Sequence, residues 1–216
     1  VYNMISEENY FVHSDDTHDE NCIFFLGHLS HAKGYCDILK SIPKIVQEFP
    51  DVKFCFAGTV ITEERNVFFN GVTGKPITYT NPEDIFREYI GNAYEANYKY
   101  LGKLDEKQKI DWLNKSNVFI LPSYSEGFSM SVLEAIAVGK PIVTTPVGAL
   151  KDVLKNEVNA IIVNPGDIEA ITNAILRFLR DKAFRKSVAN NNKVLRYDFS
   201  VDTISKKYKE LFNSML

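Results

Sequence analysis

Short apolar runs alternate along the chain with segments in which apolar residues recur at helical spacing. The runs are rich in β-branched and aromatic residues, and most of them end at a glycine, a proline or a polar turn. This pattern predicts buried strands, because a strand covered on both faces has no polar side. The six predicted strands are IFFL (23–26), KFCFA (53–57), KYL (99–101), VFIL (118–121), IVTT (142–145) and IIV (161–163).

Helical spacing is found between these runs. Apolar residues recur at helical intervals from Ile38 to Phe49, and Pro50 ends the segment. Two more helices are predicted to begin at Asp105 and Asp167, whose side chains can cap the first turn. The alternation of strands with helices predicts an α/β fold built on a Rossmann-like, doubly wound parallel sheet.

Two stretches depart from this alternation. Residues 1–21 are acidic and show little periodicity, so we expect them to form an exposed lead-in or linker. Residues 62–98 are longer than an ordinary connection, and their turn signals flank a segment that can hold one helix. This excursion is rich in tyrosines, which more often anchor such a segment to the body than contact a ligand. They are Tyr79, Tyr89, Tyr94 and Tyr98.

The predicted organisation is therefore a lead-in (1–21), a Rossmann-like domain (22–199) that contains the excursion, and a C-terminal helix (200–216) with an apolar stripe. That stripe can pack on this domain or on a further one. The chain starts at Val1 rather than at a methionine, which suggests a piece of a longer protein.

Composition narrows the class of protein. The 216 residues are 45% hydrophobic, and the net charge of -3 comes from scattered charges, so no broad surface for nucleic acid is expected. No apolar run approaches the ~18 residues that a membrane span needs, and no signal peptide is evident at the start. The odd number of cysteines, without CxxC spacing, favours reduced thiols and a cytoplasmic protein. They are Cys22, Cys36 and Cys55.

Several common site signatures are absent. There is no GxGxxG, and GVTGKP fails as a P-loop because Phe69 and Pro76 stand where Gly and Ser or Thr are required. GFSMS is not GxSxG, and all four histidines precede it, which excludes an α/β-hydrolase order. The pair His28 and His31 lacks a third ligand at a recognised spacing, so no metal is expected.

One buried carboxylate needs an explanation. Glu134 is the only charged residue between Gly127 and Gly139, in a helix-like run of small and apolar residues, and such a carboxylate is costly unless it is paired. Its partner is either a ligand or a lysine of another element, such as Lys140 or Lys151.

The preceding strand places this helix at a ligand-binding edge. VFIL leads through a glycine-containing turn to a helix that begins near Ser129, at the carboxyl edge of the sheet. Unpaired N–H groups of the first helical turn favour a phosphate there.

Glu126 converges with Glu134 only if it lies in the turn, and both carboxylates would accept hydrogen bonds from sugar hydroxyls. The alternative for Glu126 is a favourable charge near the helix N-terminus. Gly148, after the next strand, is expected to let the backbone approach the same pocket.

The segment SEGFSMSVLEAIAVGKPIVTTPVGALKDVL resembles the Glu-x(7)-Glu segment of the family 4 (group 1) glycosyltransferases, which are retaining enzymes of GT-B fold. Four other segments resemble the family's pattern in the right order, so the likeness covers nearly all of the chain outside 62–98. They are YLGKLDEKQ, NKSNVFILPS, AIIVNPGDIEAITNAILRFLRD and FSVDTISKKYKELF. The resemblance implies the C-terminal, nucleotide-sugar donor half of such an enzyme.

The resemblance also implies roles for individual residues. Glu126 would act at the donor sugar, Lys33 would neutralise the diphosphate, and Glu134 would hold the ribose hydroxyls. His28 stands where the family commonly has an arginine, which departs from the pattern because an imidazole cannot form a bidentate fork. The expected donor site is completed by Gly27, Gly127, Phe128, Ser129, Met130 and Gly148.

The implied activity is retaining transfer of a sugar from a nucleotide donor, most simply a UDP- or GDP-sugar, to an acceptor hydroxyl in polysaccharide or glycolipid synthesis. No permanently bound cofactor is expected. The acceptor would be reached through an absent N-terminal domain, so this half alone would be inactive, and peripheral association with the inner face of the membrane stays open. A nucleotide-sugar 2-epimerase and a non-catalytic sugar-nucleotide binding module are the alternatives.

Overall fold

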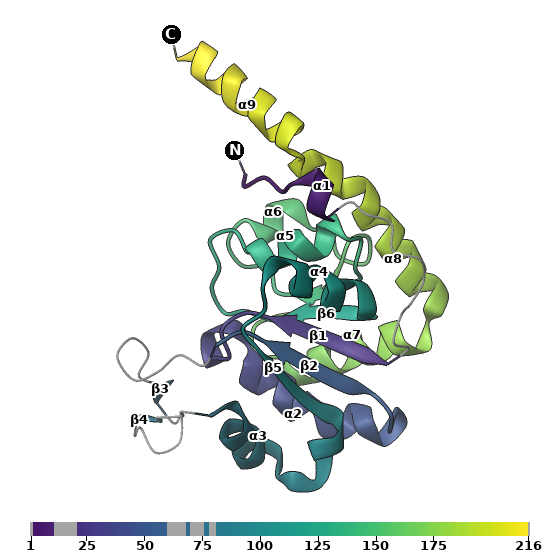
Figure 1. The fold of residues 1–216 in the computed structure, drawn as a ribbon. Coiled ribbons are helices and arrows are strands. Elements are labelled where there is room, and N and C mark those ends of the chain that lie inside the picture. Colours follow the sequence, from purple (N-terminus) through teal and green to yellow (C-terminus); the bar gives the residue numbers. More distant parts are fainter. Residues whose placement is uncertain (1, 11–20, 60–67, 70–75, 78–80, 216) are drawn as a thin grey trace.

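The computed structural model describes residues 2–10, 21–59, 68–69, 76–77 and 81–215. Within these residues, a six-stranded sheet has the order β5-β2-β1-β6-β7-β8, and all its neighbouring strands run parallel (Figure 1). Its strands are β1 (Cys22–Leu26), β2 (Lys53–Ala57), β5 (Tyr98–Gly102), β6 (Val118–Leu121), β7 (Ile142–Thr144) and β8 (Ile161–Ile162). The predicted fold class and all six predicted strands are confirmed, with ends shifted by one residue at most.

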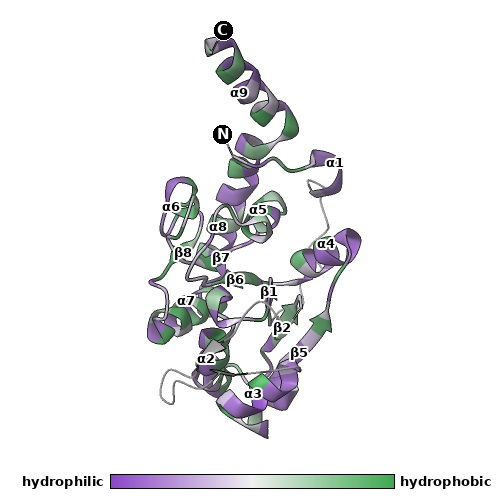
Figure 2. Ribbon diagram, turned by 90° about the vertical axis from the view of Figure 1, so that its left-hand side faces the viewer, coloured by the Kyte–Doolittle hydropathy of each residue, from purple (hydrophilic) through white to green (hydrophobic). Residues whose placement is uncertain are grey.

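Helices cover both faces of the sheet. In Figure 1, α4, α5 and α6 lie on one side of the strands, and α2 and α3 lie on the other. Helix α7 packs beside α2, and α8 returns from α7 to α5. The bounds are α2 (Tyr35–Glu48), α3 (Pro82–Ile90), α4 (Glu106–Lys115), α5 (Met130–Ala137), α6 (Leu150–Val153), α7 (Ile168–Arg180) and α8 (Lys182–Leu195). The cover on both faces explains why the central strands β1 and β6 are apolar (Figure 2) and buried along their whole length, whereas the edge strand β5 is only partly buried.

The predicted helix starts hold. Asp105 and Asp167 are the N-caps of α4 and α7, and their side chains accept hydrogen bonds from backbone N–H groups at 2.8 and 2.9 Å. Helix α2 begins at Tyr35, earlier than the predicted Ile38, and ends before Pro50 as expected.

The connections change direction between β1 and β6. The chain leaves β1 toward β2 on one side of the sheet, whereas it leaves β6 toward β7 on the other side. The loops that follow β1 and β6 therefore meet at the carboxyl edge with no helix between them, which is where doubly wound sheets bind ligands. The backbones touch: the N–H of Tyr124 donates to the carbonyl of Ala32 at 2.9 Å. A Cβ at Gly34 would lie 2.3 Å from the carbonyl oxygen of Pro122.

The loop after β7 closes the same edge. Gly148 has a φ of 56°, and a Cβ at this position would lie 2.1 Å from the carbonyl oxygen of Glu126. The N–H of Ala149 donates to the carbonyl of Gly127 at 3.0 Å. Three loops thus form one edge, and the expected close approach at Gly148 is present.

The described part of the lead-in is exposed over much of its length, as expected, but it is also anchored to the domain at two buried residues, Ile5 and Tyr10. Ile5 is buried, and its N–H donates to the carbonyl of Phe199 at 3.0 Å. Helix α1 (Glu7–Tyr10) ends with a buried tyrosine, and Tyr2 stacks on Phe128 with ring centroids 5.3 Å apart. The reason is packing: α1 lies against α5, whose residues from Val132 to Ala137 are all buried.

The excursion after β2 is anchored by aromatic residues. Its predicted helix is α3, and the hydroxyl groups of Tyr98 and Tyr35 lie 2.9 Å apart. The Tyr98 ring also packs on Phe86 and Phe56, with centroids 4.4 and 5.2 Å away. The two-residue strands β3 (Phe68–Phe69) and β4 (Pro76–Ile77) pair antiparallel in a separate sheet. Tyr79 lies outside the described residues, and Tyr89 and Tyr94 pack partly buried against the core.

The predicted C-terminal helix is present as α9 (Val201–Ser214) and projects away from the domain in Figures 1 and 2. Ile204 is its buried residue, while its apolar side chains farther along are exposed. The exposed apolar residues of this end are Val201, Tyr208, Leu211, Phe212 and Met215. In the described part of the chain, no helix is long and apolar enough to cross a bilayer.

The loop contact at Gly148 can be tested by substitution. We expect Gly148→Ala to lower the free energy of unfolding by ~1 to 3 kcal/mol, because it combines strain at positive φ with a backbone overlap. Gly102→Ala is the matched control, since Gly102 also has positive φ but open space around its Cβ position. Urea unfolding measures both, and equal losses for the two variants would contradict the close approach.

Candidate functional site

Glu126 lies in the turn before α5, as convergence with Glu134 requires, because the helix begins only at Met130. Its Oε1 accepts hydrogen bonds from Lys33 Nζ at 2.8 Å and from Ser123 Oγ at 2.7 Å. The Glu126 side chain is only 7% exposed, whereas that of Lys33 is 26% exposed. The loops after β1 and β6 are therefore joined by an ion pair at the switch point.

Glu134 is buried and paired. Its Oε1 accepts hydrogen bonds from Lys109 Nζ, on α4, and from the Tyr10 hydroxyl, on α1, the latter at 3.0 Å. The expected alternative, a lysine of another element, is therefore present, but this lysine is Lys109. Lys140 instead donates to the carbonyls of Asn114 and Ser116 at the end of α4. Lys151, the other candidate, is exposed.

Tyr10 is fixed as a donor in this contact. Burial, and secondarily the Glu134 carboxylate, raise the pKa of the Tyr10 hydroxyl above its ordinary value. The phenol therefore stays protonated at neutral pH and donates to the carboxylate. Glu134 thus has one cationic and one neutral donor, which offset the cost of its burial.

The start of α5 offers backbone rather than side-chain donors. Within the described residues, the side chain of the N-cap Ser129 accepts no hydrogen bond from a backbone N–H of the first turn. Its Oγ is instead hydrogen-bonded to Ser131 Oγ, 3.2 Å away. Gly127 and Met130 are exposed, while the Phe128 ring packs on Phe199 with centroids 5.8 Å apart. Unpaired first-turn N–H groups and the positive end of the helix dipole are features that favour an anion at such a position.

His28 and Gly27 lie on the loop after β1. The His28 side chain is exposed, and its Nδ1 lies 3.2 Å from Thr59 Oγ1 on the loop after β2. Gly27 donates its N–H to the carbonyl of Ala57 at 3.0 Å. Both predicted residues of this loop thus lie at the carboxyl edge of the sheet. His28 contacts the loop that follows β2, and it does not contact Glu126.

An aromatic pair stands at the same edge. The rings of His31 and Tyr124 stack with centroids 4.7 Å apart. The Tyr124 hydroxyl donates to Asp37 Oδ2 at 2.8 Å, and burial and this carboxylate raise the pKa of Tyr124 to about 12. His31 is therefore placed against an aromatic ring. In the part of the chain that the structure describes, no three His, Cys, Asp or Glu side chains gather as a metal site.

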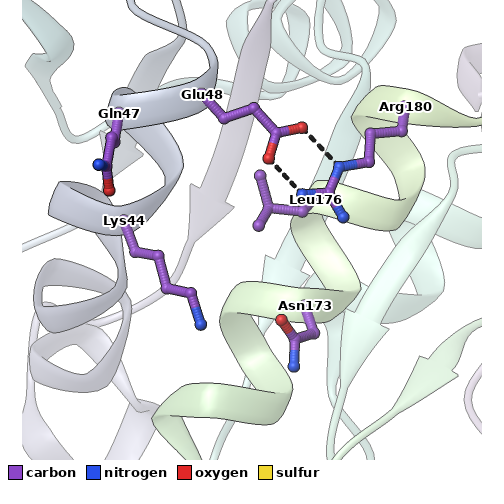
Figure 3. A pocket seen from close by; sticks show the side chains of 6 residues that line it. All are labelled: Lys44, Gln47, Glu48, Asn173, Leu176 and Arg180. Carbon is purple, nitrogen blue, oxygen red and sulfur yellow. Dashed lines mark hydrogen bonds and ion pairs between the residues drawn. The ribbon is translucent and has the colours of Figure 1, made fainter.

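A cavity of about 490 Å³ lies elsewhere, between α2 and α7 (Figure 3). Both helices run from the carboxyl edge of the sheet to the opposite edge, and the lining residues fall mainly in their later turns. Two of its lining residues, Glu48 and Arg180, form an ion pair across it. The lining residues are Lys44, Gln47, Glu48, Asn173, Leu176 and Arg180. None of the predicted site residues lines it.

Sequence reasoning missed Lys109 and Tyr10. A signal for Lys109 existed, because it stands four positions before the buried Leu113 and so shares its helical face. No comparable signal existed for Tyr10, which follows an acidic stretch without periodicity.

A known family matches most of the chain. The sequence model described as glycosyl transferases group 1 matches residues 6–194. The chain belongs to this glycosyltransferase family.

Relatives of the glycosyltransferase chain are longer than it is. An uncharacterized glycosyltransferase of Methanocaldococcus jannaschii is 30% identical over 190 residues, covering 88% of this chain and 44% of the relative. A capsular polysaccharide biosynthesis glycosyltransferase of Staphylococcus aureus, CapM, is 25% identical over 201 residues, covering 92% and 47%. The chain therefore spans less than half the length of these curated relatives.

Solved structures of glycosyltransferases share the fold. The C-terminal domain of a group 1 family protein from Francisella tularensis has a TM-score of 0.76 at 14% identity, over 91% of this chain and 99% of that domain. Anabaena HepE, solved with UDP-glucose, has a TM-score of 0.74 at 18% identity, over 91% and 49%. The chain thus has the architecture of one half of GT-B glycosyltransferases.

The pairing of Glu134 in this glycosyltransferase chain can be measured by a double-mutant cycle. We expect Lys109→Met and Glu134→Leu to couple by ~1 to 3 kcal/mol in the free energy of unfolding, because each single change leaves a poorly solvated charge without its partner. The matched cycle uses Arg87→Met and Glu95→Leu, an exposed pair 3.2 Å apart, for which ~0.2 to 0.5 kcal/mol is expected. Equal couplings in the two cycles would contradict the buried pairing.

Proposed function

We propose that the chain is the donor half of a retaining glycosyltransferase, and that it binds a nucleoside diphosphate sugar at the carboxyl edge between β1 and β6. The single observation that carries this proposal is the arrangement around α5. A helix start with uncapped N–H groups lies in the same helix as a buried, oriented carboxylate. The N–H groups at the helix start are suited to bind a diphosphate, and the carboxylate is suited to accept hydrogen bonds from a ribose diol.

The diphosphate would lie at the start of α5. The backbone N–H groups from Gly127 to Met130 are the donors that we assign to it, with Gly148 keeping the space beside the turn free of a side chain. Gly27 and His28 would border the diphosphate from the loop after β1. Side-chain charge would come from Lys33.

Lys33 and Glu126 would act at the reacting centre. In transfer, the bond from the anomeric carbon to the diphosphate oxygen breaks, a bond to the acceptor oxygen forms, and the acceptor's proton passes to the departing diphosphate. Lys33 would stabilise the negative charge that develops on the departing diphosphate. Ser123 holds Glu126 independently of Lys33, so Glu126 keeps a donor when Lys33 turns to the diphosphate.

The acceptor would be supplied by a second, N-terminal half. The chain's span of less than half of its relatives supports this division, as does the likeness to a domain described as C-terminal in Francisella tularensis. The exposed apolar residues of α9 would pack on that half. By analogy with the named capsular polysaccharide relative, the acceptor would be a growing polysaccharide or glycolipid at the cytoplasmic face of the membrane.

Nucleotide binding tests the proposal. We expect calorimetric titration of the chain with UDP, GDP, ADP and CDP to show selective binding of one of them. Glu134→Ala is expected to weaken that binding at least ~tenfold. The variant removes the carboxylate that accepts hydrogen bonds from Tyr10 and Lys109, and it also removes the acceptor for the ribose hydroxyls. Glu210→Ala, at an exposed site on α9, is the control and should bind as the wild type does. Absence of binding to all four nucleotides would contradict the proposal.

His28 favours a second candidate function, a non-catalytic binding module, because the resemblance places an arginine there. We expect His28→Arg to change the affinity for the preferred nucleotide by less than ~threefold, since Lys33 already supplies the cation and the imidazole has its own partner, Thr59. A rise of ~tenfold or more would indicate a degenerate donor site and favour the binding module. The same titration measures both variants.

A further inference from the structure

Three separate elements meet at the Glu134 carboxylate. Glu134 is on α5, Lys109 is on α4, and Tyr10 comes from the lead-in, 124 positions earlier in the chain. A second contact ties the lead-in to α4, where Asn9 Nδ2 donates to Glu106 Oε1 at 3.2 Å. Helix α1 is therefore docked on both helices at the proposed nucleotide site.

Both donors use the same oxygen of the carboxylate. A carboxylate has about four acceptor positions, two on each oxygen. Lys109 and Tyr10 occupy two of them on Oε1, and neither is bonded to Oε2. Among the described residues, about two positions on Oε2 therefore remain, which is the number of hydroxyl donors in a vicinal diol. The contacts also fix which oxygen faces away from α4 and α1.

Stability alone does not explain this cluster. Glu134 is surrounded by buried apolar residues of its own helix, and an apolar side chain at this position would avoid the cost of desolvating a charge. A buried pair that costs this much to form is better explained by a role for the carboxylate. The two donors then set its orientation rather than serve only to neutralise it.

We propose that Lys109 and Tyr10 are positioning residues, which hold Glu134 by Oε1 so that Oε2 receives the ribose diol of the nucleotide. This inference rests on the proposed function. It makes the lead-in part of nucleotide recognition, although Tyr10 itself need not touch the ligand. Its specific consequence is discrimination between ribose and a sugar that lacks the diol.

The test compares ribonucleotides with nucleotides that lack both hydroxyls. UDP, GDP, ADP and CDP and their 2′,3′-dideoxy counterparts are titrated into the wild-type chain, and the ratio of the two Kd values is recorded for the nucleotide that binds. We expect a ratio of ~tenfold or more for the wild type. Tyr10→Phe and Lys109→Met should each reduce it at least ~threefold by weakening only the ribonucleotide, and Lys109→Arg should restore part of it.

Two matched variants control for general effects. Lys107→Met removes an exposed lysine from the same helix, and Tyr2→Phe removes a hydroxyl from the same lead-in without touching the ring stack. Both should keep the wild-type ratio. Tyr10→Phe retains the buried ring, so it decides the question if Lys109→Met fails to fold.

The outcomes separate the two proposals. Normal binding by the wild type, with an unchanged ratio in Tyr10→Phe and Lys109→Met, would overturn the positioning role and leave the proposed function standing. Equal weakening of ribonucleotide and dideoxynucleotide binding would also overturn it, because it indicates a structural role only. No binding of any nucleotide by the wild type would overturn the proposed function and this inference together.

Discussion

The adjacent placement of β1 and β6 is the constraint on which the site depends. These strands pair in parallel although the chain leaves them in opposite directions, so their following loops share one edge without a helix between them. Gly34 permits the contact with Pro122, and Lys33 then reaches Glu126, 93 positions away in the sequence. A bulkier turn at either loop would separate these two charges.

Electrostatic pairing makes this edge compatible with an anionic ligand. Two unpaired carboxylates beside a diphosphate would repel it, but each carboxylate here has its own lysine: Glu126 pairs with Lys33 and Glu134 with Lys109. The lysines come from different elements, the first from the loop after β1 and the second from α4. The negative and positive side-chain charges at this edge therefore balance locally, and the dipole of α5 adds partial positive charge at its N-terminus.

The sequence predicted the parts of the structure that local patterns specify. Apolar runs located every strand of the six-stranded sheet, and side-chain caps located two helix starts. It also set the condition that Glu126 must lie in the turn before α5 to converge with Glu134, and the structure meets that condition. Partner identity was not predictable in the same way. Lys109 lies within α4, and Lys140 lies just after α5. The sequence does not show which of these two lysines contacts Glu134, because the packing of the helices in the folded chain decides it. The burial of Tyr10 likewise depends on α5, far away in the sequence.

The central claim is that α5 presents both a diphosphate site and a ribose site to one nucleotide. A crystal structure of the chain with its bound nucleoside diphosphate tests this most directly. We expect the diphosphate within hydrogen-bond distance of the N–H groups at the start of α5, and a ribose hydroxyl on Glu134 Oε2. A nucleotide bound elsewhere, such as in the cavity between α2 and α7, with the Glu134 carboxylate contacting only Lys109 and Tyr10, would contradict the claim.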